Sequence, residues 1–118
     1  MFDYFYGKQS DQFNFIRIPA VFFTDEKFIG MSTDAKVLYG ALLSRMKLSA
    51  ENGWRDQDGR VYIICTIEFV QEFMNCGNKK ASSLMMELEK VGLIERKRQG
   101  FGKPNLTYVK NFACESDG

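Results

Sequence analysis

The sequence predicts an α+β fold, namely a winged helix-turn-helix with a small antiparallel sheet and an aromatic N-terminal arm, on three observations. Two helical patterns are joined by a short, glycine-containing break at residues 75–77, as in a helix-turn-helix. Two strand-like runs follow, at residues 93–99 and 105–109. The loop between them, residues 100–104, holds two glycines, a lysine and a proline, which is the composition expected of a wing.

The composition limits the chain to one domain. It has 118 residues, of which 45% are hydrophobic, enough for a single core. It has three cysteines and no histidine, so the usual ligands of a zinc site are missing and we expect reduced thiols, no metal and no cofactor. No basic leader or long apolar run is visible, so we expect a cytoplasmic protein without a membrane span.

Motifs for catalysis are not visible in the sequence, and we expect that the chain is not an enzyme. There is no histidine base and no carboxylate pair with a supporting motif. A phosphate-binding loop needs Ser or Thr after its lysine, but Pro104 follows Lys103. A calcium loop with Gly59 as its central glycine would put Trp54 and Cys65 at ligand positions, so that motif fails too.

Residues 1–18 form the expected N-terminal arm. Residues 14–18 have strand-like composition, and Pro19 ends any regular pairing there. Two interpretations of the arm stay open: its rings cover the domain's own helices, or they form the contact of a homodimer, because aromatic side chains concentrate at interfaces. The rings concerned are Phe2, Tyr4, Phe5, Tyr6, Phe13 and Phe15.

A long core helix is predicted next. A short helical turn near residues 24–28 ends at Gly30, after which Ser32 can cap a helix and Asp34 can complement the helix dipole. Gly40, inside this helix, indicates the close approach of a neighbouring segment. The apolar face comprises Ala35, Leu38, Tyr39, Leu42 and Met46. Residues 49–60 are then polar and rich in turn signals, and residues 61–65 are predicted to be a strand.

The helix-turn-helix follows. Thr66 can cap a helix whose buried face would be Ile67, Val70, Phe73 and Met74. The second helix begins at Asn78 and ends before Gly92. Its inward positions are Ala81, Leu84, Met85, Leu88 and Val91. Its outward positions are Asn78, Lys79, Ser82, Ser83, Met86 and Lys90.

Positive charge is concentrated in this region. Residues 79–103 hold seven basic and three acidic side chains, a net charge of +4, whereas the remainder holds nine basic and twelve acidic side chains, a net charge of −3. Such a local surface attracts phosphate even when the whole chain is near neutral. On the helix alone, a merely solvated face is an equally good interpretation, and the basic wing favours DNA binding.

The candidate DNA-binding residues divide by expected role. In a helix-turn-helix the second helix enters the major groove by its N-terminal end. We therefore expect base contacts from Asn78, Lys79, Ser82 and Ser83. Contacts to the sugar-phosphate backbone are expected from Lys80, Lys90, Arg96, Lys97, Arg98 and Lys103. Strand alternation places Arg96 and Arg98 on one face and Lys97 on the other with Glu95, so one of these sets should not face DNA.

Eight short stretches of the chain form a recognisable set. They are Arg17-Ile18-Pro19, Phe23-Thr24-Asp25-Glu26, Ser32-Thr33-Asp34-Ala35-Lys36, Asn52-Gly53-Trp54, Asp58-Gly59-Arg60-Val61-Tyr62, Asn75-Cys76-Gly77, Gly92-Leu93-Ile94-Glu95-Arg96-Lys97-Arg98-Gln99-Gly100 and Gly102-Lys103-Pro104-Asn105. Through them, residues 15–112 resemble the N-terminal domain of the RepA_N family of plasmid replication initiators. The resemblance departs at Phe69, and also at Ser82 and Ser83, which lie in the helix that sets base preference.

This resemblance implies a winged-helix initiator that binds double-stranded DNA at repeated origin sites, or iterons, usually as a homodimer. It also implies a C-terminal domain for host replication factors, which we expect to be absent from this chain. The expected division is an arm at residues 1–18, a DNA-binding domain at 19–112 and a polar tail or start of a linker at 113–118. Two alternatives stay open: a transcriptional regulator with a palindromic site, and a winged-helix protein-interaction module.

Overall fold

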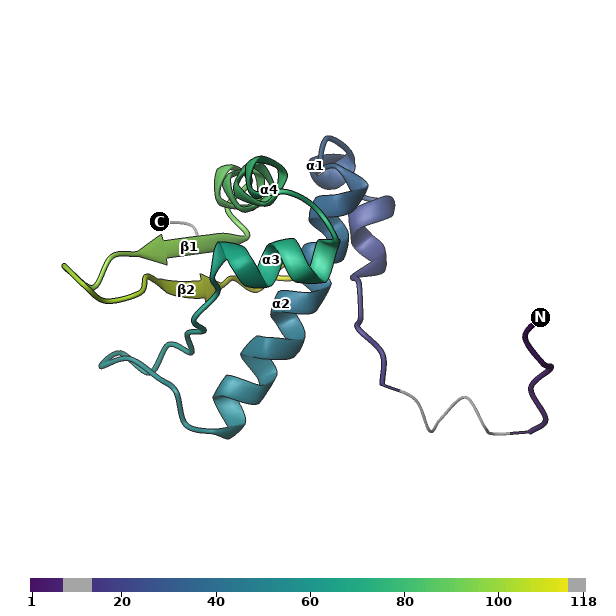
Figure 1. The fold of residues 1–118 in the computed structure, drawn as a ribbon, viewed down its shortest axis with the longest axis horizontal. Coiled ribbons are helices and arrows are strands. Elements are labelled where there is room, and N and C mark those ends of the chain that lie inside the picture. The colour runs from purple at the N-terminus through teal and green to yellow at the C-terminus, as the bar shows by residue number, and fades with distance from the viewer. Residues whose placement is uncertain (8–13, 115–118) are drawn as a thin grey trace.

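The long helix α2 runs through the middle of the molecule, and the other elements pack around it (Figure 1). The computed structural model describes residues 1–7 and 14–114. The elements are a 3-10 helix η2 (Ala20–Phe23), α1 (Glu26–Ile29), α2 (Thr33–Glu51), α3 (Ile67–Met74), α4 (Asn78–Lys90), β1 (Ile94–Lys97) and β2 (Leu106–Val109). The strands form an antiparallel hairpin beside the helices, which confirms the predicted α+β winged helix-turn-helix.

The core lies between α2, α3, α4 and the sheet. Leu38, Tyr39 and Leu42 of α2 are fully buried, as predicted, and pack in one cluster with apolar side chains of α3 and α4. Burying a side chain of this size stabilises the fold by about 1.5–3 kcal/mol. Phe112 closes the cluster after β2, because its ring packs edge-on against those of Phe22 and Tyr39. The segment after the hairpin therefore belongs to the same core.

The beginning of α2 follows the predicted capping. The Ser32 side chain accepts a hydrogen bond from the Ala35 amide, and Gly30 ends α1. Gly40 meets a neighbour as expected: a Cβ at this position would lie 2.8 Å from the backbone oxygen of Arg17. The chain before η2 therefore passes directly over α2, at a point where only glycine leaves room.

The N-terminal arm differs from the predictions. Residues 14–18 form no strand within the described structure, and no bridge pairs them with another described segment. Pro19 instead precedes η2, which the sequence did not suggest. The rings of Phe2, Tyr4, Phe5, Tyr6 and Phe15 are exposed, so they are not buried against the domain's helices. Phe13 lies outside the described residues.

The segment between α2 and α3 also differs. Helix α2 continues to Glu51, so residues 49–51 are helical and not part of the polar loop. The predicted strand at residues 61–65 is wrong as a continuous element. Only Ile63 pairs with β2, where its amide and carbonyl bond to Thr107 at 2.8 and 2.9 Å. One residue of this segment thus extends the sheet at its edge.

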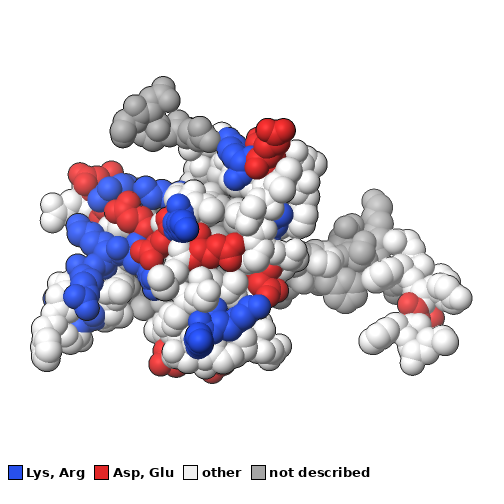
Figure 2. Space-filling view, turned by 90° about the horizontal axis from the view of Figure 1, so that it is seen from above, with Lys and Arg blue, Asp and Glu red and all other residues white. Residues whose placement is uncertain are grey.

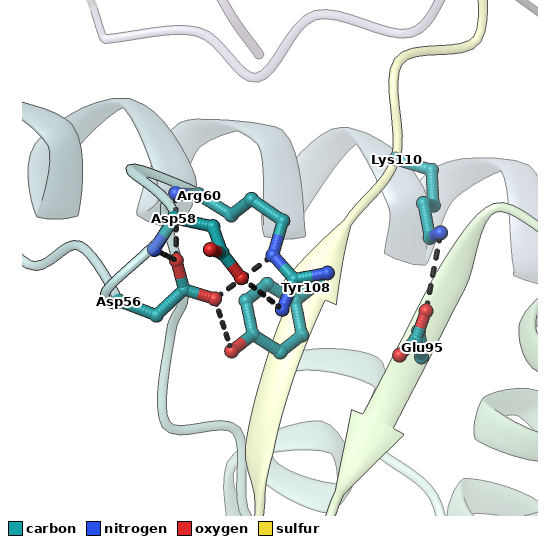
Figure 3. Close-up of polar contacts among 6 residues, drawn as sticks. All are labelled: Asp56, Asp58, Arg60, Glu95, Tyr108 and Lys110. Carbon is teal, nitrogen blue, oxygen red and sulfur yellow. Dashed lines mark hydrogen bonds and ion pairs between the residues drawn. The ribbon is translucent and has the colours of Figure 1, made fainter. Parts of the chain in front are cut away.

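A polar network fixes the turn at residues 56–60 to the sheet (Figure 3). Asp56 accepts hydrogen bonds from the Tyr108 hydroxyl and from the Arg60 Nε, both at 2.9 Å. Burial opposes ionisation of this carboxyl, but the hydrogen bonds outweigh it and lower its pKa to about 2. The Arg60 guanidinium also lies 5.0 Å from the centre of the Tyr108 ring. The turn is therefore attached to β2 through the contacts of Asp56 and Arg60 with Tyr108.

The two strands of the hairpin are shorter than predicted. The strands pair Ile94 with Val109 and Lys97 with Leu106, so residues 98–99 belong to the loop and not to the strand. Val91 is 43% exposed at the end of α4, although its spacing predicted an inward position, because α4 ends at Lys90. Gly92 ends the helix with a positive φ of 86°, as expected.

The described part of the chain has neither a membrane-spanning helix nor a cluster of metal ligands. No helix in it has the length and apolar character needed to cross a membrane. No group of three or more His, Cys, Asp or Glu side chains in residues 1–7 and 14–114 is placed to hold a metal ion.

Candidate nucleic-acid interface

The turn between α3 and α4 is built by two backbone conformations. Asn75 ends α3 in the left-handed region at φ 52°, a conformation that asparagine tolerates better than most residues. The Cys76 amide then bonds back to the Gln71 carbonyl at 3.1 Å. Gly77 is the N-cap residue before α4 and supplies no side-chain cap. The first backbone amides of α4 can therefore still donate hydrogen bonds. Together with the positive end of the helix dipole, they can attract an anion.

Helix α4 has one buried and one exposed face. Ala81, Leu84, Met85 and Leu88 are buried against the core, as predicted. Of the predicted outward positions, Asn78, Lys79, Ser83, Met86 and Lys90 are exposed, and Ser82 is half-buried at the edge. Three of the four candidate base-contacting residues thus lie on the exposed face near the beginning of α4.

Met86 was not among the candidate DNA-binding residues, yet it is 62% exposed in the middle of the outward face of α4. It lies three positions after Ser83 and therefore one turn further along the same face. The signal was present in the sequence, as an apolar side chain at an outward helical position. An exposed apolar group on such a helix has the chemistry to contact a thymine methyl group.

Lys80 is directed back to the body of the domain. Its ammonium group lies 2.7 Å from the Asp34 carboxylate, in the first turn of α2. The hydrogen bond with Asp34 raises the pKa of Lys80. The pair is partly exposed, so it contributes little stability, but it neutralises much of the charge that Lys80 would offer a phosphate. Lys80 therefore contacts α2 and is a weaker candidate than Lys79.

The two faces of β1 separate its basic residues. Arg96 is half-buried on the side of α4 and donates a hydrogen bond to Glu89 at 2.6 Å. This bond lowers the pKa of Glu89. Lys97 is exposed on the other face, where Glu95 forms an ion pair with Lys110 at 3.2 Å (Figure 3). Arg96 is therefore occupied within the domain, whereas Lys97 is exposed.

The loop at residues 98–105, which we call the wing, is exposed along its whole length. Gly100 and Gly102 both have positive φ, at 125° and 79°. The Lys103 amide bonds to the Gly100 carbonyl at 3.3 Å, and the Gln99 side chain donates to the Pro104 carbonyl at 2.8 Å. These contacts close the loop around a hollow of about 410 Å³ lined by Arg98, Gly100, Phe101, Gly102, Lys103 and Asn105.

The distribution of charge on the molecule is uneven. Figure 2, seen from above, shows Lys and Arg side chains gathered toward the end that carries the wing, with acidic side chains among them. The hairpin projects beyond the end-on helix α4 in Figure 1. Most of the exposed candidates form two groups, one at the beginning of α4 and one on the wing and the end of β1, and Lys90 lies at the other end of α4.

The chain is similar in sequence to a known protein family and to a curated relative. A family model described as "Replication initiator protein A (RepA) N-terminus" matches residues 14–117. A curated relative, a "41 kDa protein" of Lactobacillus helveticus, is 30% identical over 91 residues, which are 77% of this chain. The chain spans only 26% of the length of that relative.

Solved structures resemble the fold closely. A structure described as "N-Terminal domain of DNA binding protein" is 35% identical with a TM-score of 0.77, and covers 94% of this chain and 85% of its own. One described as "Structure of Rep-DNA complex" is 36% identical with a TM-score of 0.76, and covers 92% and 84%. A "Structure of MDR initiator" is 36% identical with a TM-score of 0.73, and covers 92% and 86%.

Proposed function

This chain belongs to the family of replication initiator protein A (RepA) N-terminal domains, and on that premise we propose that it binds plasmid origin DNA sequence-specifically. The observation that carries the proposal is the pairing, in one domain, of a basic wing with the exposed face of helix α4, whose beginning has no side-chain cap. A similar solved structure is described as a Rep-DNA complex. The proposed activity is recognition of duplex DNA, without catalysis, in the cytoplasm.

Helix α4 is proposed to read bases in the major groove. Asn78, Lys79 and Ser83 lie on its exposed face, and Met86 adds an apolar contact. Side chains of these types recognise base edges through hydrogen bonds and thymine through its methyl group. Ser82 is half-buried and would reach bases only at the edge of the contact. The free amides at the beginning of α4 would hold a phosphate.

The wing is proposed to hold the sugar-phosphate backbone. Arg98 and Lys103 are exposed on it, and Lys97 precedes it on the open face of β1. Each phosphate contact releases counterions and adds about 0.9 to the log–log salt dependence of binding. Lys90, exposed at the end of α4, is a further candidate. Arg96 and Lys80 are weaker candidates, because Glu89 and Asp34 already neutralise them.

The assembly around this domain is also part of the proposal. The target would be tandem iterons, bound by a homodimer, and host replication factors would bind a further C-terminal domain. Exposed aromatic rings in the arm, residues 1–18, support its use as a dimer contact. Phe112 packs into the core and supports a DNA-binding domain at residues 19–112. Residues 113–118 would begin the linker, and residues 115–118 of it lie outside the described structure.

Binding to origin repeats tests the proposal. Fluorescence polarisation would compare tandem repeats from the parent plasmid with a scrambled duplex of equal length, at two salt concentrations. We expect a preference of about 10³-fold or more, with a steep salt dependence. Lys103→Ala should weaken binding to both duplexes and reduce the salt slope, whereas Asn78→Ala should cost roughly 1–3 kcal/mol and relax specificity.

The outcomes separate the alternatives. A preference for one palindromic promoter site over tandem repeats would identify a transcriptional regulator. No binding to any duplex would identify a protein-interaction module. For the dimer contact, deletion of residues 1–12 should lower the mass in sedimentation while the helical circular dichroism spectrum is retained. An unchanged mass would exclude the arm as the interface.

A further inference from the structure

Phe101 is the most unusual side chain of the wing. It is fully exposed, although a phenylalanine ring is among the most hydrophobic side chains. Such an exposed ring contributes nothing to the core. It lies at the tip of the hairpin, where it belongs to the turn from residue 101 to residue 103. No contribution to folding explains a large apolar group at this position.

The backbone on both sides of Phe101 holds the ring away from the domain. Gly100 at φ 125° and Gly102 at φ 79° adopt conformations that other residues rarely take. A Cβ added at either glycine would meet no atom within 4 Å, so the turn is surrounded by open space. The hydrogen bond from the Lys103 amide to Gly100 closes the turn behind the ring. The sequence Gly-Phe-Gly therefore presents one aromatic side chain on a closed turn.

The surroundings of the ring favour nucleic acid over protein as its partner. Arg98 and Lys103 line the same hollow as Phe101, and Phe101 is the one large exposed hydrophobic side chain within residues 98–105. A protein interface would be expected to present several apolar groups together. A single ring between cations instead matches the minor groove, where basic side chains meet phosphates and an apolar wedge enters between base pairs.

We propose that Phe101 is a wedge that inserts from the minor groove into one base-pair step, so that the wing bends the DNA and selects a step that unstacks easily. The proposal rests on the proposed function, and adds a specificity-determining residue that makes no hydrogen bond to a base. Pyrimidine–purine steps are the most easily kinked, whereas A-tracts are stiff. The wedge therefore makes the wing sensitive to DNA deformability.

Three variants separate the wedge from other roles. Phe101→Ala removes the ring, and Phe101→Leu keeps an apolar wedge of smaller size. Lys103→Ala is the matched control in the same loop, because it removes a charge and keeps the ring. Since Phe101 is fully exposed, neither Phe101 variant should change the melting temperature of the domain. A loss of DNA affinity would then not be due to unfolding.

The experiment uses a duplex selected by the wild-type chain from a random-sequence pool. Affinity is measured at two salt concentrations, and bending is measured by energy transfer between dyes at the two DNA ends. We expect Phe101→Ala to bind roughly 5- to 30-fold more weakly, to reduce the bend and to keep the salt slope. Phe101→Leu should retain most of the bend, and Lys103→Ala should reduce the slope by about 0.9.

A second arm tests the selection of a step. Each pyrimidine–purine step of the selected duplex is replaced in turn by a stiff A-tract step. One of these replacements should weaken DNA binding by the wild type and leave DNA binding by Phe101→Ala unchanged. Equal bend and affinity for wild type and Phe101→Ala would overturn the wedge while leaving the proposed function intact, as would a Phe101→Ala protein that loses salt slope. Failure of the wild type to select any duplex would overturn the proposed function itself.

Discussion

Glu87 of α4 binds Ser32, the residue that caps α2, through both of its carboxylate oxygens. The Ser32 amide donates to Oε2 at 2.6 Å, and the Ser32 hydroxyl donates to Oε1 at 2.8 Å. The same hydroxyl accepts a hydrogen bond from the Ala35 amide at 3.1 Å. One carboxylate on the candidate DNA-binding helix thus takes part in capping the central helix, so the two helices are held in a fixed relation.

Glu87→Ala should destabilise the domain by about 1 kcal/mol, because two hydrogen bonds to an ionised acceptor are lost at a partly exposed site. Urea unfolding followed by circular dichroism measures this difference. Glu87→Gln is the matched control, since its amide oxygen still accepts one hydrogen bond, and it should lose less. Equal stability of wild type and Glu87→Ala would show that the contact contributes nothing.

Gly40→Ala should destabilise the domain by about 1–3 kcal/mol, although alanine is the better helix former, because the added methyl group overpacks the contact. The new Cβ would lie 2.8 Å from the Arg17 oxygen, which is backbone and must shift. Gly30→Ala is the control, since a Cβ there meets nothing within 4 Å. Thermal unfolding of the two variants should diverge, and an unchanged or raised melting temperature for Gly40→Ala would contradict the packing.

The stability supplied by Asp56 should disappear in acid. Its pKa is lowered from 3.8 to about 2 in the folded domain, so its contribution is present above the unfolded value and is lost as the pH falls through the folded value. Asp56→Asn should therefore be less stable than wild type near neutral pH. The difference should shrink between about pH 4 and pH 2. Melting temperatures across this range check it, and a constant difference would argue against the charged network.

Arg96 and Lys97 should respond differently to substitution despite being neighbours. Arg96→Ala removes the 2.6 Å contact with Glu89 and should lower stability by about 1 kcal/mol, with little change in the salt slope of DNA binding. Lys97→Ala should leave stability within about 0.5 kcal/mol and lower the slope. Parallel denaturation and polarisation titrations decide this. A slope lowered by Arg96→Ala alone would reverse the assignment of the two faces.

Much of the fold follows from local signals in the sequence. Ser32 and Thr66 cap their helices, and Gly92 ends α4, because these effects involve residues within one helical turn. The isolated bridge at Ile63 could not be predicted in the same way. Whether an apolar run becomes a strand depends on the partner that the tertiary structure offers, and β2 offers residues 61–65 a partner only at Thr107.

The candidate site was predictable in its elements and less so in its charges. Alternation separated Arg96 from Lys97, but the sequence does not say that Glu89 lies opposite Arg96 or Asp34 opposite Lys80. Both pairs join residues on different elements, so their contacts depend on how the helices and the sheet pack. Counting basic residues along the chain therefore overstates the positive charge available to a phosphate.

The single pairing of Ile63 with Thr107 has a mechanical consequence. It attaches the outer edge of β2 to the segment before α3, while the Lys110 amide bonds to the Leu93 carbonyl at 2.8 Å and continues the hairpin's own pairing beyond Ile94 and Val109. Beyond Lys97 and Leu106 the ladder ends, and the chain continues as an exposed turn. The paired part of the hairpin is thus anchored to the domain through Thr107, and the exposed turn at its end extends beyond that attachment. A force applied to the exposed turn would therefore act on the bridge between Thr107 and Ile63, and through it on the segment that leads into α3.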